Sequence, residues 1–231
     1  MKRPIELAVA AILVTATTVS HADEAAVEGS ARLEEITVTA QKRAENLQRT
    51  PAAITAITGE ALVAAGVADI RAAQNLVPSV RFQAENASTE IYIRGIGSTL
   101  DLPNIEPPTA FNFNGVYIPR EGTSVGLFDI ARIEVLPGTQ GTLYGRAALG
   151  GAVNVEFNRP GEGPGTTALV EAGNYSLFRA SAAQDLPVSE ALAFRVAGDY
   201  IRHDGYQQTG ADSKDDYALR VSALFEPSLG M

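Results

Sequence analysis

The sequence contains no cysteine and no tryptophan, and only two of its 231 residues are histidines. Without cysteine, a disulfide framework and a thiolate metal site are both excluded. With His21 and His203 as its only imidazoles, the chain is a poor candidate for a histidine-based catalytic triad or a zinc centre. Acids outnumber bases, and the net charge of −9 argues against nucleic acid as a partner.

Long apolar runs are missing as well, since no segment approaches the ~18 apolar residues of a spanning helix. Residues 1–22 have the layout of a secretory signal peptide, because Lys2 and Arg3 precede the apolar run Leu7–Val14 and Ser20-His21-Ala22 resembles a small-x-small cleavage site. A short membrane anchor is the alternative, but the run is too short to span ~30 Å. We therefore expect export to the periplasm, the exterior or a barrel membrane.

Residues 23–50 are predicted to be a flexible N-terminal connection. Asp23–Arg32 is small, polar and acidic, which is typical of chain without a fixed fold. Further on, Ile36 and Val38 alternate with threonines in a β-prone pattern. A segment of this kind can add itself as a strand to the sheet edge of another protein. An ordinary first strand of the following domain is the alternative interpretation.

The most informative stretch is Asp129–Pro160, in which two alternating apolar runs flank a glycine-rich centre. Arg132–Leu136 places Ile133 and Val135 on one face of a strand, and Ala152–Phe157 repeats the alternation. Glycine gives the backbone between these runs access to positive φ and to close approach. The stretch therefore predicts a strand, tight irregular turns and a second strand, buried on at least one side.

Two ligand-binding interpretations of this glycine-rich centre are weak. A phosphate-binding loop needs G-x-x-x-x-G-K-[ST] or G-x-G-x-x-G, and neither pattern occurs here. Gly138 and Gly141 have the spacing of a nucleic-acid-binding Gly-x-x-Gly loop, but little positive charge surrounds them. Turns in a compact domain are compatible with the same residues.

Residues 51–160 are predicted to form a small α+β domain, a mixed sheet with short helices. Thr58 is placed to cap a helix over Gly59–Ala65, and Asp69 is placed to cap a second helix over Ile70–Leu76. Short strands are also expected at Ala52–Ile57, Val80–Phe82, Glu90–Ile93 and Phe111–Ile118. The prolines and acids between the last two of these strands indicate a loop.

After Pro160 the pattern changes to alternating strands at hairpin spacing. Each strand carries apolar residues on one face and polar or charged residues on the other, which is typical of a transmembrane barrel. A soluble antiparallel sheet with one wet face has the same alternation. Antiparallel β-strands are expected within residues 161–231, at Thr166–Ala172, Leu177–Leu186, Ala191–His203 and Tyr217–Glu226. The alternation alone fits both sheets, and the signal peptide and the resemblance described below favour an incomplete transmembrane β-barrel.

Several short motifs occur together in the glycine-rich stretch: Ile133-Glu134-Val135-Leu136, Gln140-Gly141-Thr142-Leu143-Tyr144-Gly145, Gly150-Gly151-Ala152-Val153-Asn154 and Arg159-Pro160. They resemble the end of the plug domain of TonB-dependent outer-membrane receptors, and Ile93-Arg94-Gly95 resembles the I-R-G motif of that family. Two positions depart from the family pattern, since Pro137 replaces an arginine and Asn114 an aspartate. The resemblance implies that the missing arginine would pair with carboxylates on the barrel wall, a contact that proline cannot make.

The resemblance also assigns residues to roles. The segment within residues 34–40 resembles the TonB box, which implies pairing with the periplasmic energy-coupling protein TonB. Arg94 and Glu134 are expected to contact the barrel. The TonB box would comprise Glu35, Ile36, Thr37, Val38, Thr39 and Ala40, and the motif glycines would be Gly95, Gly138, Gly141, Gly145, Gly150 and Gly151.

The function implied by this resemblance is energy-coupled uptake of a scarce solute across the outer membrane. Iron–siderophore complexes, cobalamin and oligosaccharides are all allowed as the solute, and neither a catalytic residue, a metal nor a cofactor is required. Because even small membrane barrels need about eight strands, we expect the chain to be an N-terminal fragment or a truncated product. A soluble periplasmic binding or interaction module, made of the plug alone, is the alternative. An enzyme using paired acids is a weaker one, because the acids are scattered.

Overall fold

The computed structural model describes residues 36–39, 42–43, 45–67, 70–85, 88–98, 105–123, 126–162, 164–207, 210 and 213–227. The chain divides into two units, Met1–Glu34 and Glu35–Met231, and only the second contains described residues. The predicted signal peptide, the acidic N-terminus and the predicted TonB-box residues Glu35 and Ala40 therefore lie outside the described residues.

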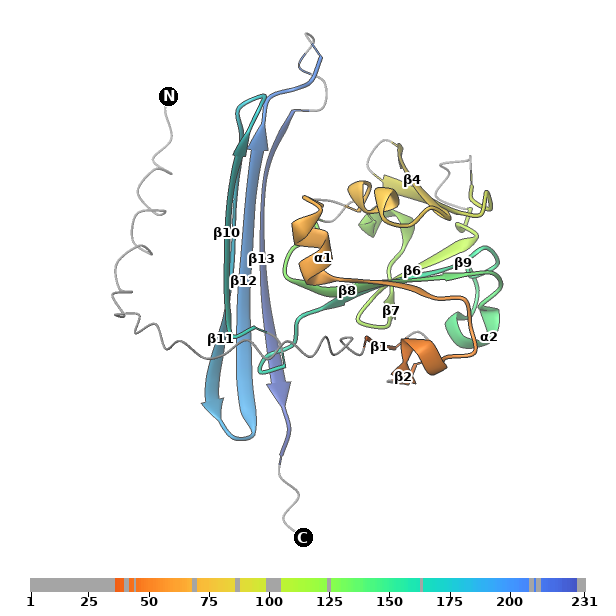
Figure 1. Ribbon diagram of the computed structural model, residues 1–231, viewed down its shortest axis with the longest axis horizontal. Coiled ribbons are helices and arrows are strands. Elements are labelled where there is room, and N and C mark those ends of the chain that lie inside the picture. The colour runs from red at the N-terminus through yellow and green to blue at the C-terminus, as the bar shows by residue number, and fades with distance from the viewer. Residues whose placement is uncertain are drawn as a thin grey trace, which may run out of the picture. The chain divides into compact units, whose positions relative to one another are not determined.

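A mixed five-stranded sheet organises the region predicted to be a plug (Figure 1). The β6–β9 pair is parallel, and the other neighbours are antiparallel. Ile133 lies opposite Val155, so the two strands predicted on either side of the glycine-rich centre pair with each other. The strand order is β3 (Thr55–Thr58), β8 (Ile130–Pro137), β9 (Gly151–Phe157), β6 (Thr109–Phe113) and β7 (Val116–Tyr117).

Alternation along β8 and β9 gives this sheet one apolar face and one polar face. Ile133 and Val135 share a buried face, as predicted, and join Val153 in the main hydrophobic core. Residues at the intervening positions point the other way, yet Glu134 and Asn154 are also buried, at 0% and 3% exposure. Buried polar groups need partners, so this second face must be covered by another part of the chain.

The predicted first helix is confirmed as α1 (Gly59–Ala64), where the Thr58 hydroxyl accepts a hydrogen bond from the Ala61 amide at 3.3 Å. The predicted second helix over Ile70–Leu76 is wrong as an α-helix. Its place is taken by a 3₁₀ helix, η2 (Ala72–Asn75), and the predicted cap residue Asp69 lies outside the described residues. Short segments favour this tighter geometry. The remaining short helices are η1 (Leu47–Arg49), η3 (Arg120–Gly122) and α2 (Gly141–Tyr144), the last lying where only irregular turns were predicted.

A separate hairpin, β4 (Val80–Glu85) with β5 (Ser88–Ile93), packs with the same core. Both strands are longer than predicted, because polar residues expected in the turn are part of the ladder. Thr89 and Glu90 are buried, and Glu90 forms an ion pair with Arg120. Partners elsewhere in the fold thus allow polar residues to occupy a buried strand.

Four long strands follow in a simple antiparallel meander (Figure 1): β10 (Thr166–Gly173), β11 (Leu177–Ser189), β12 (Leu192–His203) and β13 (Lys214–Phe225). All four strand predictions are confirmed, with ends that shift by a few residues. The strands begin after the connection at 161–165 and pair in chain order.

This four-stranded sheet has the polarity of a membrane wall. Val170, Leu219 and Val221 are 74%, 73% and 61% exposed, whereas Arg179 and Arg195 on the opposite face are 6% and 1% exposed. A soluble sheet would present the reverse arrangement to water. Separately, none of the helices in the described part of the chain is both long enough and apolar enough to cross a membrane.

Candidate functional site

The segment predicted to be the TonB box forms a small hairpin with the residues that follow it. β1 (Thr37–Val38) pairs with β2 (Glu45–Asn46), and the Leu47 amide donates to the Ile36 carbonyl at 3.0 Å. Val38 is 1% exposed, whereas Thr37 is exposed. One side of this segment is therefore buried in the described structure.

Thr39 attaches this hairpin to the polar face of the plug sheet. Its amide donates to Glu134 Oε1 at 2.7 Å, and its hydroxyl lies 3.2 Å from the same oxygen and 3.4 Å from Glu156 Oε1. Arg132 donates through Nε to Glu134 Oε1 at 2.7 Å and through Nη2 to the Thr39 hydroxyl at 3.1 Å. One threonine thus joins two carboxylates and a guanidinium from β8 and β9.

The electrostatics of this cluster are unbalanced. Glu134 is fully buried and is contacted by Arg132, whereas Arg159 acts on Glu156 through its charge alone. Burial raises the pKa of Glu156, and the negative charge of Glu134 raises it further, against the lowering effect of Arg132. Glu134 Oε2 is buried and receives no hydrogen bond within the described part of the chain. The site is thus held by strong hydrogen bonds but is not fully satisfied.

A polar chain continues across the sheet from this cluster. The Asn154 amide donates to the Tyr144 hydroxyl at 2.6 Å and accepts from Asn112 at 3.0 Å, while the Lys42 ammonium lies 5.7 Å from the Tyr144 ring centroid. Burial raises the pKa of Tyr144, partly offset by the hydrogen bond from Asn154. An open cavity of about 310 Å³ adjoins these residues, lined by Thr39, Lys42, Arg43, Asn114, Gly115, Tyr144, Asn154, Glu156 and Arg159.

A second charged cluster joins the plug to the long strands. Asp129, 3% exposed in its side chain, receives Arg195 Nε at 2.9 Å and Nη2 at 2.7 Å, together with Arg220 Nη2 at 2.6 Å. Asn158 donates to the same carboxylate at 2.8 Å. Burial by itself raises the pKa of Asp129, but the hydrogen bonds and the two guanidinium charges outweigh it, so the pKa lies below its usual range.

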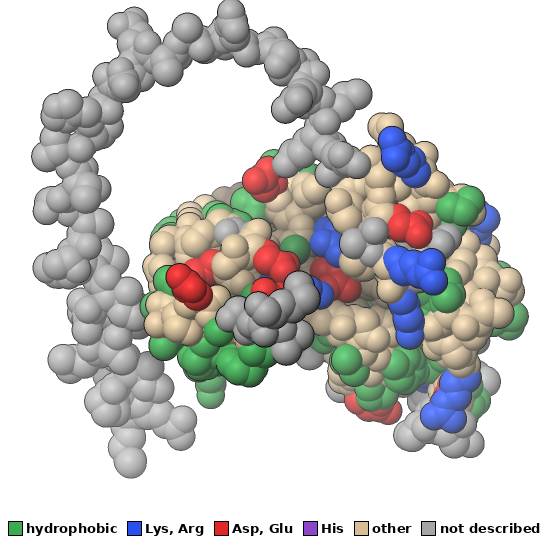
Figure 2. Space-filling view, turned by 90° about the horizontal axis from the view of Figure 1, so that it is seen from below, with side chains coloured by type: hydrophobic (Ala, Val, Ile, Leu, Met, Phe, Trp, Pro, Cys, Tyr) green, Lys and Arg blue, Asp and Glu red, His purple; other side chains and the backbone are tan. Residues whose placement is uncertain are grey.

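The arginines of this junction are themselves well placed. Arg195 also donates to Asp185 at 2.7 Å and to the Pro164 carbonyl at 2.9 Å. The Arg220 guanidinium lies 4.0 Å from the Phe157 ring centroid, within range of a cation–π contact. Acidic and basic side chains lie close together on the face shown in Figure 2, next to hydrophobic surface. The plug is thus attached to the four-stranded sheet β10–β13, called the wall below, by charged groups within hydrogen-bond distance.

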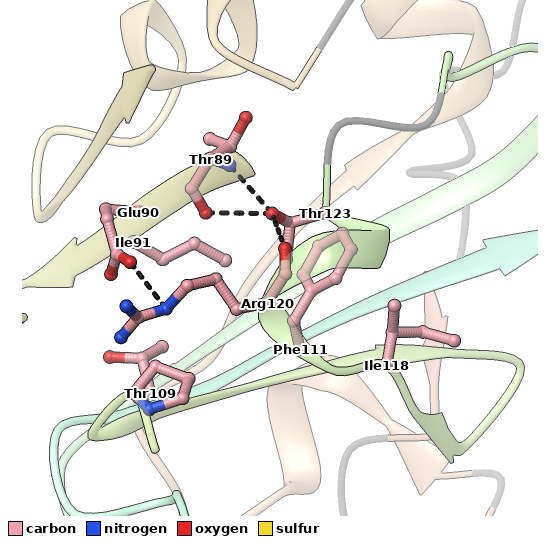
Figure 3. A pocket seen from close by; sticks show the side chains of 9 residues that line it. Thr89, Glu90, Ile91, Thr109, Phe111, Ile118, Arg120 and Thr123 are labelled. Carbon is pink, nitrogen blue, oxygen red and sulfur yellow. Dashed lines mark hydrogen bonds and ion pairs between the residues drawn. The ribbon is translucent and has the colours of Figure 1, made fainter. Parts of the chain in front are cut away.

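A third polar cluster lies inside the plug and is structural in character (Figure 3). Arg120 Nε lies 2.7 Å from Glu90 Oε1, and both side chains are buried. The Thr123 hydroxyl accepts from the Thr89 amide at 2.8 Å and lies 2.6 Å from the Arg120 carbonyl. The cavity here measures about 10 Å³, too small for any solute. This cluster fastens β5 to η3.

Comparisons with known proteins identify the family. Residues 46–152 match the family model for the TonB-dependent Receptor Plug Domain. The chain carries a plug domain of the TonB-dependent receptor type. The iron-regulated outer membrane virulence protein of Vibrio cholerae is 35% identical over 128 residues, which are 53% of this chain and 20% of that protein. The pesticin receptor of Yersinia pestis is 36% identical over 74 residues, covering 32% of this chain and 11% of the receptor.

Solved TonB-dependent receptors share the fold. The ferric yersiniabactin uptake receptor FyuA from Yersinia pestis aligns over 76% of this chain and 29% of its own, with a TM-score of 0.66 and 24% identity. The siderophore receptor PiuA from Acinetobacter baumannii aligns over 78% and 25%, with a TM-score of 0.66 and 19% identity. The family, the fold class and the outer-membrane location predicted from the sequence are confirmed, and the chain spans about a fifth of the first curated relative.

Within this plug domain, the residues predicted from motifs lie in different places. Glu134 binds Thr39 and Arg132 in the described structure, and its predicted contact with the barrel stays a prediction. Arg94 is exposed, with φ of 51°, and its barrel contact also stays a prediction. Gly151 has φ of 143°, and a Cβ there would lie 2.3 Å from the Leu136 carbonyl oxygen, so this motif glycine is required by close packing.

The plug–wall contact seen here was not among the predicted sites. Asp129, Arg195 and Arg220 form it, although Asp129 is the first residue of the glycine-rich stretch and both arginines lie on the polar face of their strands. The feature of the sequence that points to this contact is a pair of arginines on the polar face of two strands in an acidic chain. It does not reveal the partner, because Asp129 lies 66 residues from Arg195 in sequence.

Proposed function

We propose that the receptor containing this chain takes up a scarce solute, an iron–siderophore complex by preference, across the outer membrane with energy supplied by TonB. In this mechanism TonB pairs with the segment Glu35–Ala40, pulls it away from the plug and opens a path inward. The work is done by the partner, so the chain needs no catalytic residue. The relatives named above are receptors, which agrees with a protein that is not an enzyme.

The observation that carries the proposal is the attachment of Ile36–Thr39 to the plug sheet. This segment is short, β-prone and close to the N-terminal end of the plug, and it covers the polar face of β8 and β9 through Thr39. A pull on such a segment acts directly on the central strands of the sheet. Strand addition to a partner's sheet would supply the grip.

The outward face of β10–β13 supports contact with outer-membrane lipid. Val170, Tyr217 and Leu219 are 74%, 87% and 73% exposed, and the opposite face is fastened to the plug by charges. Such a wall is stable only where hydrocarbon covers it. This observation favours the membrane receptor over a soluble periplasmic module, whose exposed face would be polar.

The choice of an iron chelate as solute is supported by the relatives. The Vibrio protein is named for regulation by iron, and FyuA and PiuA are named as receptors for ferric yersiniabactin and for siderophores. Cobalamin and oligosaccharides are the other solutes to test.

The test uses cells that produce the receptor containing this chain under iron limitation. Uptake of radioactive iron from a panel of ferric siderophores should depend on the receptor, and Ile36→Pro should abolish uptake while ligand binding to the cells persists. Proline removes a backbone donor that a strand ladder needs. Ile36→Val, which keeps β propensity, is the matched control. Normal uptake by Ile36→Pro would contradict the TonB-box assignment. If the receptor takes up cobalamin and none of the ferric siderophores, the proposed iron chelate is wrong and cobalamin is the solute.

A further inference from the structure

We propose that Glu134 and Glu156 form a carboxylate latch that holds the TonB box on the plug and sets how readily this segment is released. Arg132 positions the latch, and Thr39 is the residue that it grips. The inference deepens the proposed function and rests on it for the identity of the pulling partner. The latch itself is a property of this chain and is measurable without TonB.

The latch occupies a backbone group that a partner strand would use. The Thr39 amide donates to Glu134 Oε1 at 2.7 Å, and the Ile36 carbonyl accepts from Leu47 at 3.0 Å. Strand addition requires free amide and carbonyl groups along an edge. Val38 is 1% exposed, so its side chain is also withheld from any partner. In the docked segment, two backbone groups and the Val38 side chain are therefore inaccessible to a partner strand.

The same cluster also favours release once the segment begins to move. Glu134 is fully buried, and no described residue donates to its Oε2. Glu156 stands nearby, and Arg132 is the guanidinium that contacts Glu134. Burying a carboxylate oxygen without a partner is unfavourable. Departure of Thr39 would let water reach both carboxylates, so hydration offsets part of the lost hydrogen bonding.

Protonation tunes this balance through Glu156. The groups that act on it are Arg132, Arg159 and the Thr39 hydroxyl, which lower its pKa, and burial and Glu134, which raise it to a greater extent. Lys42, Arg43 and Tyr144 line the adjoining cavity. A raised pKa means that the docked form binds a proton more strongly than a hydrated form would. Docking is therefore favoured at acidic pH, and release becomes easier as the pH rises through the raised pKa.

The experiment measures how fast a thiol at position 38 reacts with a maleimide in the purified receptor. Val38→Cys places a buried thiol in a chain that has no cysteine. We expect Glu134→Gln, made in this background, to raise the labelling rate at least about tenfold. A hydrogen bond to a charged group changes an equilibrium constant by roughly 10- to 100-fold, so its loss should expose the thiol more often by a similar factor. The matched control is Glu106→Gln, which breaks an exposed ion pair with Arg146.

A second reporter separates release from unfolding. Ala73→Cys places a thiol in the main core, 1% exposed and away from the latch. Faster labelling at position 38 with unchanged labelling at position 73 establishes the latch, whatever solute the receptor carries. Equal acceleration at both positions assigns Glu134 a purely structural role and overturns the proposal. Unchanged labelling at position 38 in the Glu134→Gln variant also overturns the proposal, even when iron uptake depends on TonB.

Discussion

Asp129 and Arg195 form a two-pronged ion pair between the plug and strand β12, with Nε–Oδ2 and Nη2–Oδ1 distances of 2.9 and 2.7 Å. Both side chains are almost fully buried, at 3% and 1% exposure. Asp129 also has φ of 53°, a conformation that aspartate and asparagine tolerate better than most residues. Charge and backbone geometry are therefore both required at this position, and they can be tested separately.

Asp129→Asn keeps a residue that accepts positive φ and removes only the charge. We expect it to lower the free energy of unfolding by about 3–5 kcal/mol, because Arg195 and Arg220 are then left buried with fewer partners. Denaturant unfolding of the receptor in detergent measures this change. Glu106→Gln, in an exposed ion pair, should change it by less than about 1 kcal/mol. Equal effects of the two substitutions on the free energy of unfolding would show that the Asp129 junction stabilises the receptor no more than an exposed ion pair does.

Gly151→Ala should destabilise the plug by at least about 2 kcal/mol, from unfavourable φ and a clash of the new Cβ with the Leu136 carbonyl. Gly141→Ala is the matched control within the same glycine-rich stretch, since no atom lies within 4 Å of a Cβ placed there. That control should be neutral or slightly stabilising. Thermal unfolding of both variants gives the comparison, and a stable Gly151→Ala variant would contradict the close packing described for β8 and β9.

Val221→Lys should impair insertion of the receptor into lipid vesicles. Val221 is 61% exposed on the apolar face of β13, and a lysine in hydrocarbon costs about 2–4 kcal/mol near the bilayer midplane. Glu226→Lys, just beyond the end of that strand, should insert normally. Insertion is measured as the protection of the folded strands against added protease. Unimpaired insertion of Val221→Lys would mean that this face does not contact lipid.

The pH dependence of docking follows from the raised pKa of Glu156. For a carboxyl group whose pKa is higher in the docked form, docking is strongest below that pKa and weakens as the pH rises through it. The thiol at Val38→Cys should therefore become less protected from labelling as the pH rises through the raised pKa of Glu156, after normalisation to an exposed thiol at Thr37→Cys. Glu156→Gln should flatten this profile. A profile that is unchanged in Glu156→Gln assigns the titration to another group.

The sequence predicted the elements whose signal is local. Ile133 and Val155 were recognisable as core residues because alternation along a strand states which face is buried. The 3₁₀ helix at Ala72–Asn75 was not, since a few residues do not distinguish its period from that of an α-helix. Thr89 was left out of the strand predicted at Glu90–Ile93, although it belongs to that strand, because its burial depends on Thr123, which lies 34 residues later.

The charged contacts were beyond prediction for a related reason. Glu134 was expected at the barrel wall from its motif, but in the described structure the Thr39 amide reaches it from 95 residues away. Asp129 was passed over because its partners, Arg195 and Arg220, lie 66 and 91 residues later in the sequence. The face of a strand can be predicted from alternation, whereas the partner across an interface depends on tertiary packing.

The short turn at Leu127–Asp129 contacts three successive strands of the wall. Arg179 of β11 donates to the Leu127 carbonyl at 3.3 Å, Arg195 of β12 to the Asp129 carboxylate, and Arg220 of β13 to the Phe128 carbonyl at 3.1 Å. A slip of one residue in any of these strands would turn its arginine towards hydrocarbon. The contacts to this turn therefore favour one register of β11, β12 and β13, because all three arginines reach their partners only when the strands are aligned as described.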